Sequence, residues 1–215
     1  FLSDRYTYMP SLGIILIIVS LAIYLGKRGK NFKTYVPVIL GIYIMANAIS
    51  AFSRVNVWEN SISLFKDVAK KYPESFFAYK SLANTYNQEG MASESLQYYD
   101  KSIELNPYHP TTFNGRGLAR HKTGDYQGAI KDYSSAIRLW PGFIKAYNNR
   151  ANIYNVLKDY EKAFRDYDKA LSMNPEYSVA YNGRGMAYYL TGQYQKALED
   201  FNACLRNNPY YSIAY

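Results

Sequence analysis

The stretch GFIKAYNNRANIYNVLKDYEKAFRDYDKALSMNP, residues 142–175, decides the fold. It ends on a proline, and prolines recur every 34 residues on both sides of it, at Pro73, Pro107, Pro141, Pro175 and Pro209. A fixed period of this length is typical of stacked helix-turn-helix units. The sequence therefore predicts an all-α solenoid over most of the chain.

Large and small side chains recur at fixed positions when each repeat is numbered from 1 to 34 with proline at position 32. Aromatic residues occupy positions 4 and 24, and mostly small residues occupy positions 8, 20 and 27, where they let two helices approach closely. At these positions the sequence resembles the tetratricopeptide repeat, which implies a right-handed α-solenoid. We predict a capping half-repeat helix at 55–74, four repeats at 76–109, 110–143, 144–177 and 178–211, and the start of a fifth at 212–215.

Residues 1–54 differ from the repeats in hydropathy and charge. Uncharged runs cover residues 11–26 and 35–52, and we predict two transmembrane helices at about 10–26 and 35–52. Of the net charge of +8, residues 1–56 carry +5, because six basic residues face the single acid Asp4. The excess gathers in the loop 27–34 rather than on the repeats, so the basicity indicates a membrane protein and excludes a nucleic-acid partner.

The loop 27–34 holds four basic residues and no acid. The positive-inside rule places such a loop in the cytoplasm and both flanking ends on the opposite side. We therefore predict an integral membrane protein whose repeats are extracytoplasmic, in a periplasm or an organelle lumen.

Two positions of the 34-residue repeat change residue type together. In three repeats position 7 is arginine and position 23 is aspartate, whereas the first repeat has Leu82 and Tyr98. This covariation predicts structural ion pairs, within a repeat or between neighbours, rather than catalytic acids. The residues concerned are Arg116, Asp132, Arg150, Asp166, Arg184 and Asp200.

In the repeat family that this chain resembles, the first helix of each unit lines a concave groove, through positions 2, 5, 9, 12 and 13. Amides are frequent at these positions, and they can pair with a peptide backbone or with sugar hydroxyls. We predict a groove for a protein or peptide, with a glycan as a second possibility; solvated side chains without a ligand are the alternative. The candidate residues are Lys80, Asn84, Asn87, Asn114, His121, Lys122, Lys145, Asn148, Asn152, Asn155, Asn182 and Tyr189.

The sequence carries no recognisable catalytic or metal-binding constellation. It has one cysteine, two histidines and no glycine-rich phosphate loop after a strand, and NGRG at residues 114–117 and 182–185 is interpreted as repeat consensus. We predict no metal, no cofactor and no catalytic residue in this stretch of chain.

The start DRYTYMPSLGI (residues 4–14), two apolar runs and repeats beginning near VWENSISLF (residues 57–65) resemble the carboxy-terminal part of transmembrane and tetratricopeptide-repeat-containing proteins. These look like lipid-phosphate-sugar-dependent O-mannosyltransferases with lumenal repeats. The resemblance implies a protein-binding module at the end of a multispanning glycosyltransferase, with membrane lipids as further partners and Asp4 and Arg5 beside a lipid phosphate. The alternative is a non-enzymatic, membrane-tethered scaffold for envelope protein assembly.

Overall fold

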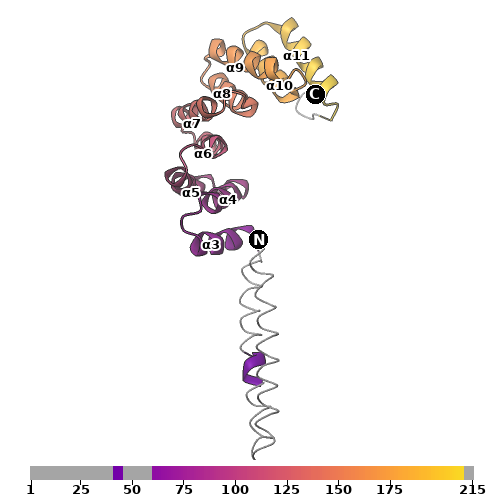
Figure 1. Cartoon of the computed structure of the whole chain (residues 1–215). Coiled ribbons are helices and arrows are strands. Elements are labelled where there is room, and N and C mark those ends of the chain that lie inside the picture. The colour runs from indigo at the N-terminus through magenta and orange to yellow at the C-terminus, as the bar shows by residue number, and fades with distance from the viewer. Residues whose placement is uncertain (1–40, 46–59, 211–215) are drawn as a thin grey trace, which may run out of the picture. The chain divides into compact units, whose positions relative to one another are not determined.

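The computed structural model describes residues 41–45 and 60–210. Residues 41–45 are helical, and the helices of residues 60–210 follow one another in chain order (Figure 1). They are α3 (Ser61–Lys71), α4 (Phe76–Gln88), α5 (Ala92–Leu105), α6 (Pro110–Lys122), α7 (Tyr126–Leu139), α8 (Ile144–Val156), α9 (Tyr160–Met173), α10 (Ser178–Leu190) and α11 (Tyr194–Asn207).

Each repeat pairs a first helix of 13 residues with a second helix of 14 residues. The pairs are α4 with α5, α6 with α7, α8 with α9 and α10 with α11. Each second helix also packs on the first helix of the next repeat, and α3 packs on α4 in the same way. Residues 60–210 therefore form an all-helical solenoid, as the 34-residue period predicts.

First helices also contact the first helices of neighbouring repeats: α4 contacts α6, α6 contacts α8, and α8 contacts α10. Successive second helices make at most marginal contacts among the described residues. Elements that lie closer together are on the inner side of a curved stack, so the first helices line the inner side. We call the residues at positions 2, 5, 9, 12 and 13 of the four repeats the first-helix face.

The predicted membrane segment lies almost entirely outside the described residues. This applies to Asp4, Arg5, the span 10–26, the loop 27–34 and most of the span 35–52. Of the predicted cap at 55–74, α3 and the turn after it are described. Among the described residues, no helix is both long enough and apolar enough to cross a membrane. The predicted spans and the start of a fifth repeat at 212–215 stay predictions.

The rings at position 24 form the centre of the stack. Tyr99, Tyr133 and Tyr167 are fully buried. Small residues beside them leave room for the rings: a Cβ added to Gly117 would lie 2.7 Å from a ring carbon of Tyr133. The alanines at positions 20 and 27 are likewise buried, so large rings and small residues together give a closely packed core.

The buried tyrosines make the fold sensitive to alkali. Burial raises the pKa of Tyr99 to about 12, against a smaller opposing effect of Asn87, and burial also raises the pKa values of Tyr133 and Tyr167. Because each folded-state pKa exceeds the unfolded value, the unfolded chain loses its protons first. The stabilisation is complete below about pH 10 and is lost as the pH rises through the folded-state values.

We expect Tyr99 alone to contribute a loss of about 3 kcal/mol in the free energy of unfolding once the pH exceeds about 12. Urea denaturation followed by circular dichroism, with tyrosinate absorbance recorded in parallel, measures the loss. The variant Tyr99→Phe should show a shallower decline with pH. A free energy of unfolding that stays constant between about pH 8 and pH 11 would contradict the expectation.

The turn between the two helices of a repeat passes through the left-handed region at position 15. Glycine occupies this position in three repeats, at Gly90, Gly124 and Gly192, with φ between 76° and 84°. The third repeat has Lys158 instead, with φ 61°. A side chain is unfavourable in this conformation, so the turn of the third repeat is strained.

Replacing Lys158 by glycine should therefore raise the free energy of unfolding, by about 0.5–1 kcal/mol. The control is Lys169→Gly, a substitution at an exposed position inside α9, which should lower the same quantity by about 1 kcal/mol. Thermal unfolding of the two variants beside the parent chain measures both effects. Equal destabilisation by the two glycines would show that the turn at Lys158 is not strained.

Candidate functional site

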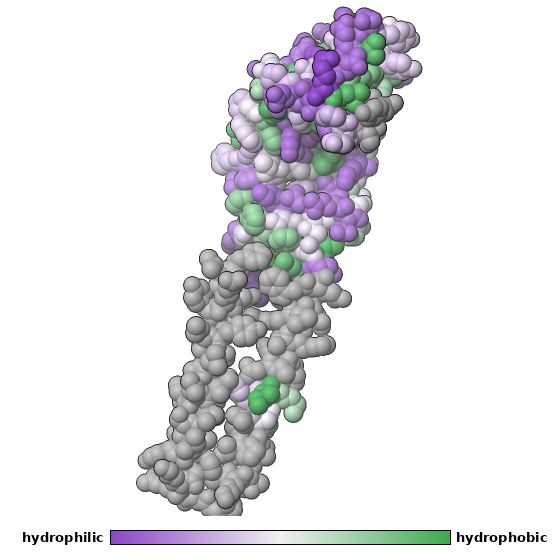
Figure 2. Space-filling model, turned by 90° about the vertical axis from the view of Figure 1, so that its right-hand side faces the viewer, coloured by the Kyte–Doolittle hydropathy of each residue, from purple (hydrophilic) through white to green (hydrophobic). Residues whose placement is uncertain are grey.

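The first-helix face carries positive charge and no carboxylate. Lys80, Lys122 and Lys145 lie on it together with His121, whereas none of its twenty positions is aspartate or glutamate. One side of the repeats is shown in Figure 2, where small hydrophobic areas are interspersed with larger hydrophilic ones. The face therefore favours a ligand that is rich in carboxylates or other hydrogen-bond acceptors.

Lys80 is the most buried of the three lysines. It is partly buried, its ammonium group lies 5.2 Å from the ring centroid of Phe77, and it forms no ion pair with another described residue. Burial lowers the pKa of Lys80. Lys122 donates to the backbone oxygen of Asn87 at 2.7 Å, and Lys145 is exposed. A partly desolvated ammonium group without a carboxylate is a ready partner for an anion from outside the chain.

Two asparagine side chains of the face are held by buried tyrosines. The Tyr99 hydroxyl donates to Asn84 Oδ1 at 2.7 Å, and the Tyr167 hydroxyl donates to Asn152 Oδ1 at 2.5 Å. Each bond engages the amide oxygen, and the Nδ2 groups of Asn84 and Asn152 make no hydrogen bond to other described residues. The two amides therefore keep their donor groups available for a ligand.

Asn155 and Asn114 are used within the fold. Asn155 Nδ2 donates to the Tyr167 hydroxyl at 3.0 Å and to the backbone oxygen of Gly183 at 3.1 Å. Asn114 Oδ1 accepts from Asn149 Nδ2 at 3.1 Å, across the boundary between the second and third repeats. Both predicted ligand contacts are thus also structural, which the sequence did not indicate.

Four amide oxygens of the face are buried and have no hydrogen-bond partner among the described residues. They belong to Asn87, Asn148, Asn155 and Asn182. Asn148 is the most enclosed, with 2% of its surface exposed. Buried acceptors without a partner are rare in folded proteins, so their concentration on one face singles it out from the rest of the stack. Because these oxygens are buried, ordered water within the stack, rather than a ligand on its surface, would satisfy them.

The two remaining predicted contacts are rings. His121 is half-buried, burial lowers its pKa, and its ring lies 6.0 Å from that of Tyr126. Tyr189 is 56% exposed and makes an edge contact with Tyr194 at 5.6 Å. Both side chains offer a flat apolar surface with a polar group, the combination that recurs at protein interfaces.

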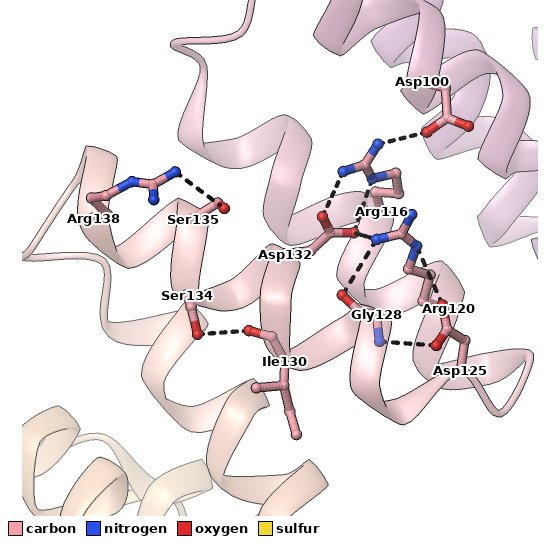
Figure 3. A network of polar contacts seen from close by, with 10 residues as sticks. All are labelled: Asp100, Arg116, Arg120, Asp125, Gly128, Ile130, Asp132, Ser134, Ser135 and Arg138. Atoms are coloured by element: carbon pink, nitrogen blue, oxygen red, sulfur yellow. Dashed lines mark hydrogen bonds and ion pairs between the residues drawn. The ribbon is translucent and has the colours of Figure 1, made fainter.

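The predicted arginine and aspartate pairs are present in the structure, and each arginine acts both within a repeat and between repeats. Arg116 donates to both carboxylate oxygens of Asp132, from Nε at 2.9 Å and from Nη2 at 2.6 Å. Its Nη1 donates to Asp100 of the preceding repeat at 2.6 Å (Figure 3). Arg120 adds a bond from Nη1 to Asp132 at 2.9 Å, so this carboxylate accepts three hydrogen bonds from two arginines.

The other two arginines repeat this arrangement. Arg150 binds both oxygens of Asp166 at 2.7 and 2.8 Å, and Arg184 binds both oxygens of Asp200 at 2.8 Å. Towards the preceding repeat, Arg184 donates to Asp168, whereas Arg150 donates to the hydroxyl of Ser134. The inter-repeat partners all occupy position 25 of the preceding repeat. The sequence analysis missed this position, although its residues Asp100, Ser134 and Asp168 can all accept a hydrogen bond from an arginine.

The arginines of these pairs are held in the charged form, as a structural ion pair requires. Hydrogen bonds and charges from Asp200 raise the pKa of Arg184, although burial alone would lower it. Burial would also lower the pKa of Arg116, but the two neighbouring carboxylates outweigh it and raise the value. In the described part of the chain, no group of histidine, cysteine or acidic side chains is arranged to hold a metal ion.

Comparison with known families identifies the repeats. Residues 144–177 and 178–211 match one family model of the tetratricopeptide repeat, and residues 78–109 match another. The matched stretches 144–177 and 178–211 have the same limits as the third and fourth predicted repeats. The pair α6 and α7 has the same helix lengths and the same packing as the matched pairs.

Two curated relatives are O-mannosyltransferases. The human protein O-mannosyl-transferase TMTC1 is 22% identical over 127 residues, which make up 57% of this chain and 14% of the relative. Protein O-mannosyl-transferase Tmtc3 of Drosophila melanogaster is 24% identical over 104 residues, 48% of this chain and 11% of the relative. The chain thus matches only a small part of the length of these relatives.

Solved structures share the solenoid fold. A crystal structure of MamA has a TM-score of 0.63 at 24% identity, covering 70% of this chain and 88% of that one. MamA from Desulfovibrio magneticus, from residue 41 to its end, has a TM-score of 0.65 at 17% identity, covering 79% and 96%. The first such repeat domain of Spaghetti (RPAP3), bound to the HSP90 peptide SRMEEVD, has a TM-score of 0.53 at 25% identity, covering 54% and 93%.

Proposed function

We propose that this chain of tetratricopeptide repeats binds an extended peptide of a partner protein on its first-helix face, at the carboxy-terminal end of a multispanning, glycosyltransferase-like membrane protein. The observation that carries the binding proposal is the set of unsatisfied groups on one face. Lys80 has no carboxylate partner among the described residues, and Asn84 and Asn152 keep free N–H donors. The carbonyl and carboxylate oxygens of a peptide supply acceptors for all three groups.

One related structure supports a peptide as the ligand. The repeat domain of Spaghetti (RPAP3), similar at 25% identity, is bound to the peptide SRMEEVD, which contains three acidic residues. An acidic segment also suits a face that has three lysines and no acid. A glycan on this face and membrane lipids at Asp4 and Arg5 stay predictions from the sequence, without support from the related proteins.

The binding proposal is tested with a library of randomised peptides of about ten residues, selected on the full chain in detergent. Recovered peptides should bind about tenfold more weakly to the variants Lys80→Glu and Lys145→Glu, because a like charge then faces an acidic ligand. The matched control is Lys131→Glu on α7, an exposed lysine of a second helix. Recovery of no peptide, or equal weakening by the control, would overturn the proposal.

The membrane context rests on other observations. It is supported by the uncharged runs at 11–26 and 35–52, by the basic loop 27–34 and by the similarity to O-mannosyltransferases. In this proposal the repeats lie outside the cytoplasm and raise the local concentration of an acceptor protein beside the membrane active site of the same polypeptide. No residue of this chain is assigned a chemical step.

The second candidate function is the non-enzymatic membrane scaffold, which uses the same face for protein assembly. The two are separated in the full-length protein by sugar transfer to an acceptor in isolated membranes. An enzyme whose repeats recruit the acceptor loses transfer when Lys80→Glu is introduced and keeps it with Lys131→Glu. Membranes without any transfer activity favour the scaffold.

A further inference from the structure

The first-helix face changes its chemistry with a period of two repeats. In the first and third repeats, positions 9 and 12 are amides: Asn84 and Asn87, then Asn152 and Asn155. In the second and fourth repeats the same positions are an apolar residue followed by a ring. These residues are Leu118 with His121 and Met186 with Tyr189.

The apolar residues of the even repeats are accessible. Leu118 is 37% exposed and Met186 is 43% exposed, and Tyr189 beside Met186 is more exposed still. The corresponding amides of the odd repeats are held by tyrosine hydroxyls, as Asn84 is by Tyr99. Each even repeat therefore offers an apolar contact, and each odd repeat offers an oriented amide donor.

The alternation is built into the packing and is not confined to the surface. Tyr99 reaches the next repeat at Gly115, where an added Cβ would lie 2.7 Å from its ring, and Tyr167 reaches Gly183 in the same way. At both of these junctions, the arginine at position 7 of the later repeat donates to a carboxylate of the preceding repeat: Arg116 to Asp100, and Arg184 to Asp168. These two features group the repeats in pairs, and we call residues 76–143 and residues 144–210 the two blocks.

The junction between the two blocks is different. There Arg150 meets the hydroxyl of Ser134 instead of a carboxylate, and position 6 carries Asn149 instead of glycine. The hydroxyl of Tyr133 has no hydrogen-bond partner among the described residues. The same two-repeat period is therefore visible in the core, at the repeat junctions and on the first-helix face.

We infer that the ligand is an acidic, extended peptide with two apolar side chains, one against Leu118 and one against Met186 and Tyr189, and with carbonyl or carboxylate oxygens at Asn84 and Asn152. This inference rests on the proposed peptide-binding function and specifies its ligand. Charge complementarity selects the acidic peptide, because the face carries lysines and no acid. The two-repeat period selects the arrangement of its side chains.

The geometry sets the spacing of the two apolar residues. Directly packed helices lie about 8–10 Å apart, and the first helices of successive repeats are in less extensive contact than that, so equivalent positions two repeats apart are separated by at least about 16–20 Å. An extended chain advances about 3.3–3.6 Å per residue. The two apolar residues of the peptide should therefore be separated by at least about five or six positions.

The test uses peptides recovered from the library, resynthesised with the two apolar residues at this spacing or at about half of it. Fluorescence anisotropy with the full chain should show binding about tenfold weaker for the halved spacing, because one apolar side chain then loses its contact. Exchange of the acidic residues for lysine should weaken binding at least as much. Binding that is independent of spacing would overturn the inference.

Two substitutions examine the face itself. Leu118→Asn gives the second repeat the residue that odd repeats have, and should weaken the peptide about tenfold; the control Leu198→Asn changes an exposed leucine of a second helix. Asn152→Asp keeps the oxygen that accepts from Tyr167 but replaces the free donor by a negative charge, so it should also weaken an acidic peptide about tenfold. Thermal unfolding confirms that each variant is folded.

The outcomes separate the inference from the function on which it rests. If the library yields no peptide for this face, the peptide-binding function fails. If peptides bind and respond to Lys80→Glu, but are indifferent to Leu118→Asn and to spacing, the function stands and the two-repeat arrangement is wrong.

Discussion

Replacing Arg150 by leucine should lower the free energy of unfolding by about 3–5 kcal/mol. Arg150 supplies both hydrogen bonds to the buried carboxylate of Asp166. Without it Asp166 is left as a buried charge with no cation beside it, and this outweighs the small gain from an apolar side chain. The contact with Ser134 across the junction is lost as well. Chemical denaturation of the variant measures the effect.

The first repeat supplies the control for this prediction. There the two positions carry Leu82 and Tyr98, and Tyr98 stacks on Tyr86 with ring centroids 5.1 Å apart. The third repeat has Tyr154 where the first repeat has Tyr86, so a tyrosine in place of Asp166 would find the same stacking partner. The double variant Arg150→Leu with Asp166→Tyr should therefore recover most of the loss. If it is no more stable than Arg150→Leu alone, the isolated charge is not the cause.

Replacing Tyr167 by alanine should lower the free energy of unfolding by about 3–5 kcal/mol. The ring is fully buried, lies among Ala151, Ala163 and Ala180, and reaches Gly183 in the next repeat. The small residues around the ring cannot fill the space that it leaves, and larger members of the same cluster, such as Leu171 and Tyr147, would fill it only in part, so a cavity remains. The same substitution also removes the hydroxyl that holds Asn152. Urea denaturation at neutral pH measures the sum of these effects.

Tyr167→Phe separates the two contributions. It keeps the ring and removes only the hydroxyl, with its bonds to Asn152 and Asn155, and should cost about 1–2 kcal/mol. In the fourth repeat Phe201 occupies the equivalent position, so the chain already accepts this ring there. An alanine variant that is as stable as the phenylalanine variant would show that ring packing contributes little at this position.

The regular part of the fold could be predicted because it depends on short-range patterns. The 34-residue period indicated the helix pairs, and the joint change of positions 7 and 23 indicated the ion pairs of Arg116, Arg150 and Arg184. Buried rings that face small residues explain why aromatic and small residues recur at the same positions in every repeat. All of these features follow from helical periodicity and from the need to close a core.

The roles of individual side chains were less accessible to sequence reasoning. Asn155 was predicted as a ligand contact, but its amide donates to Tyr167 and Gly183, because the next repeat lies within reach. Gly115 and Gly183 were interpreted as consensus, although they make room for rings of the preceding repeat. Such assignments depend on the distances between helices. The residue types at one repeat position do not give these distances.

The serine at the boundary between the two blocks has a mechanical consequence. An arginine bound to a carboxylate on each side resists separation more than one bound to a hydroxyl on one side, because only the carboxylate adds the attraction between opposite charges. Among the three junctions between the four repeats, tension applied along the stack should therefore first open the seam between residues 143 and 144, which is joined by the bonds of Arg150 to Ser134 and of Asn149 to Asn114 without an ion pair. Opening of that seam would let the inner face widen or narrow around a ligand while each block of two repeats keeps its own shape.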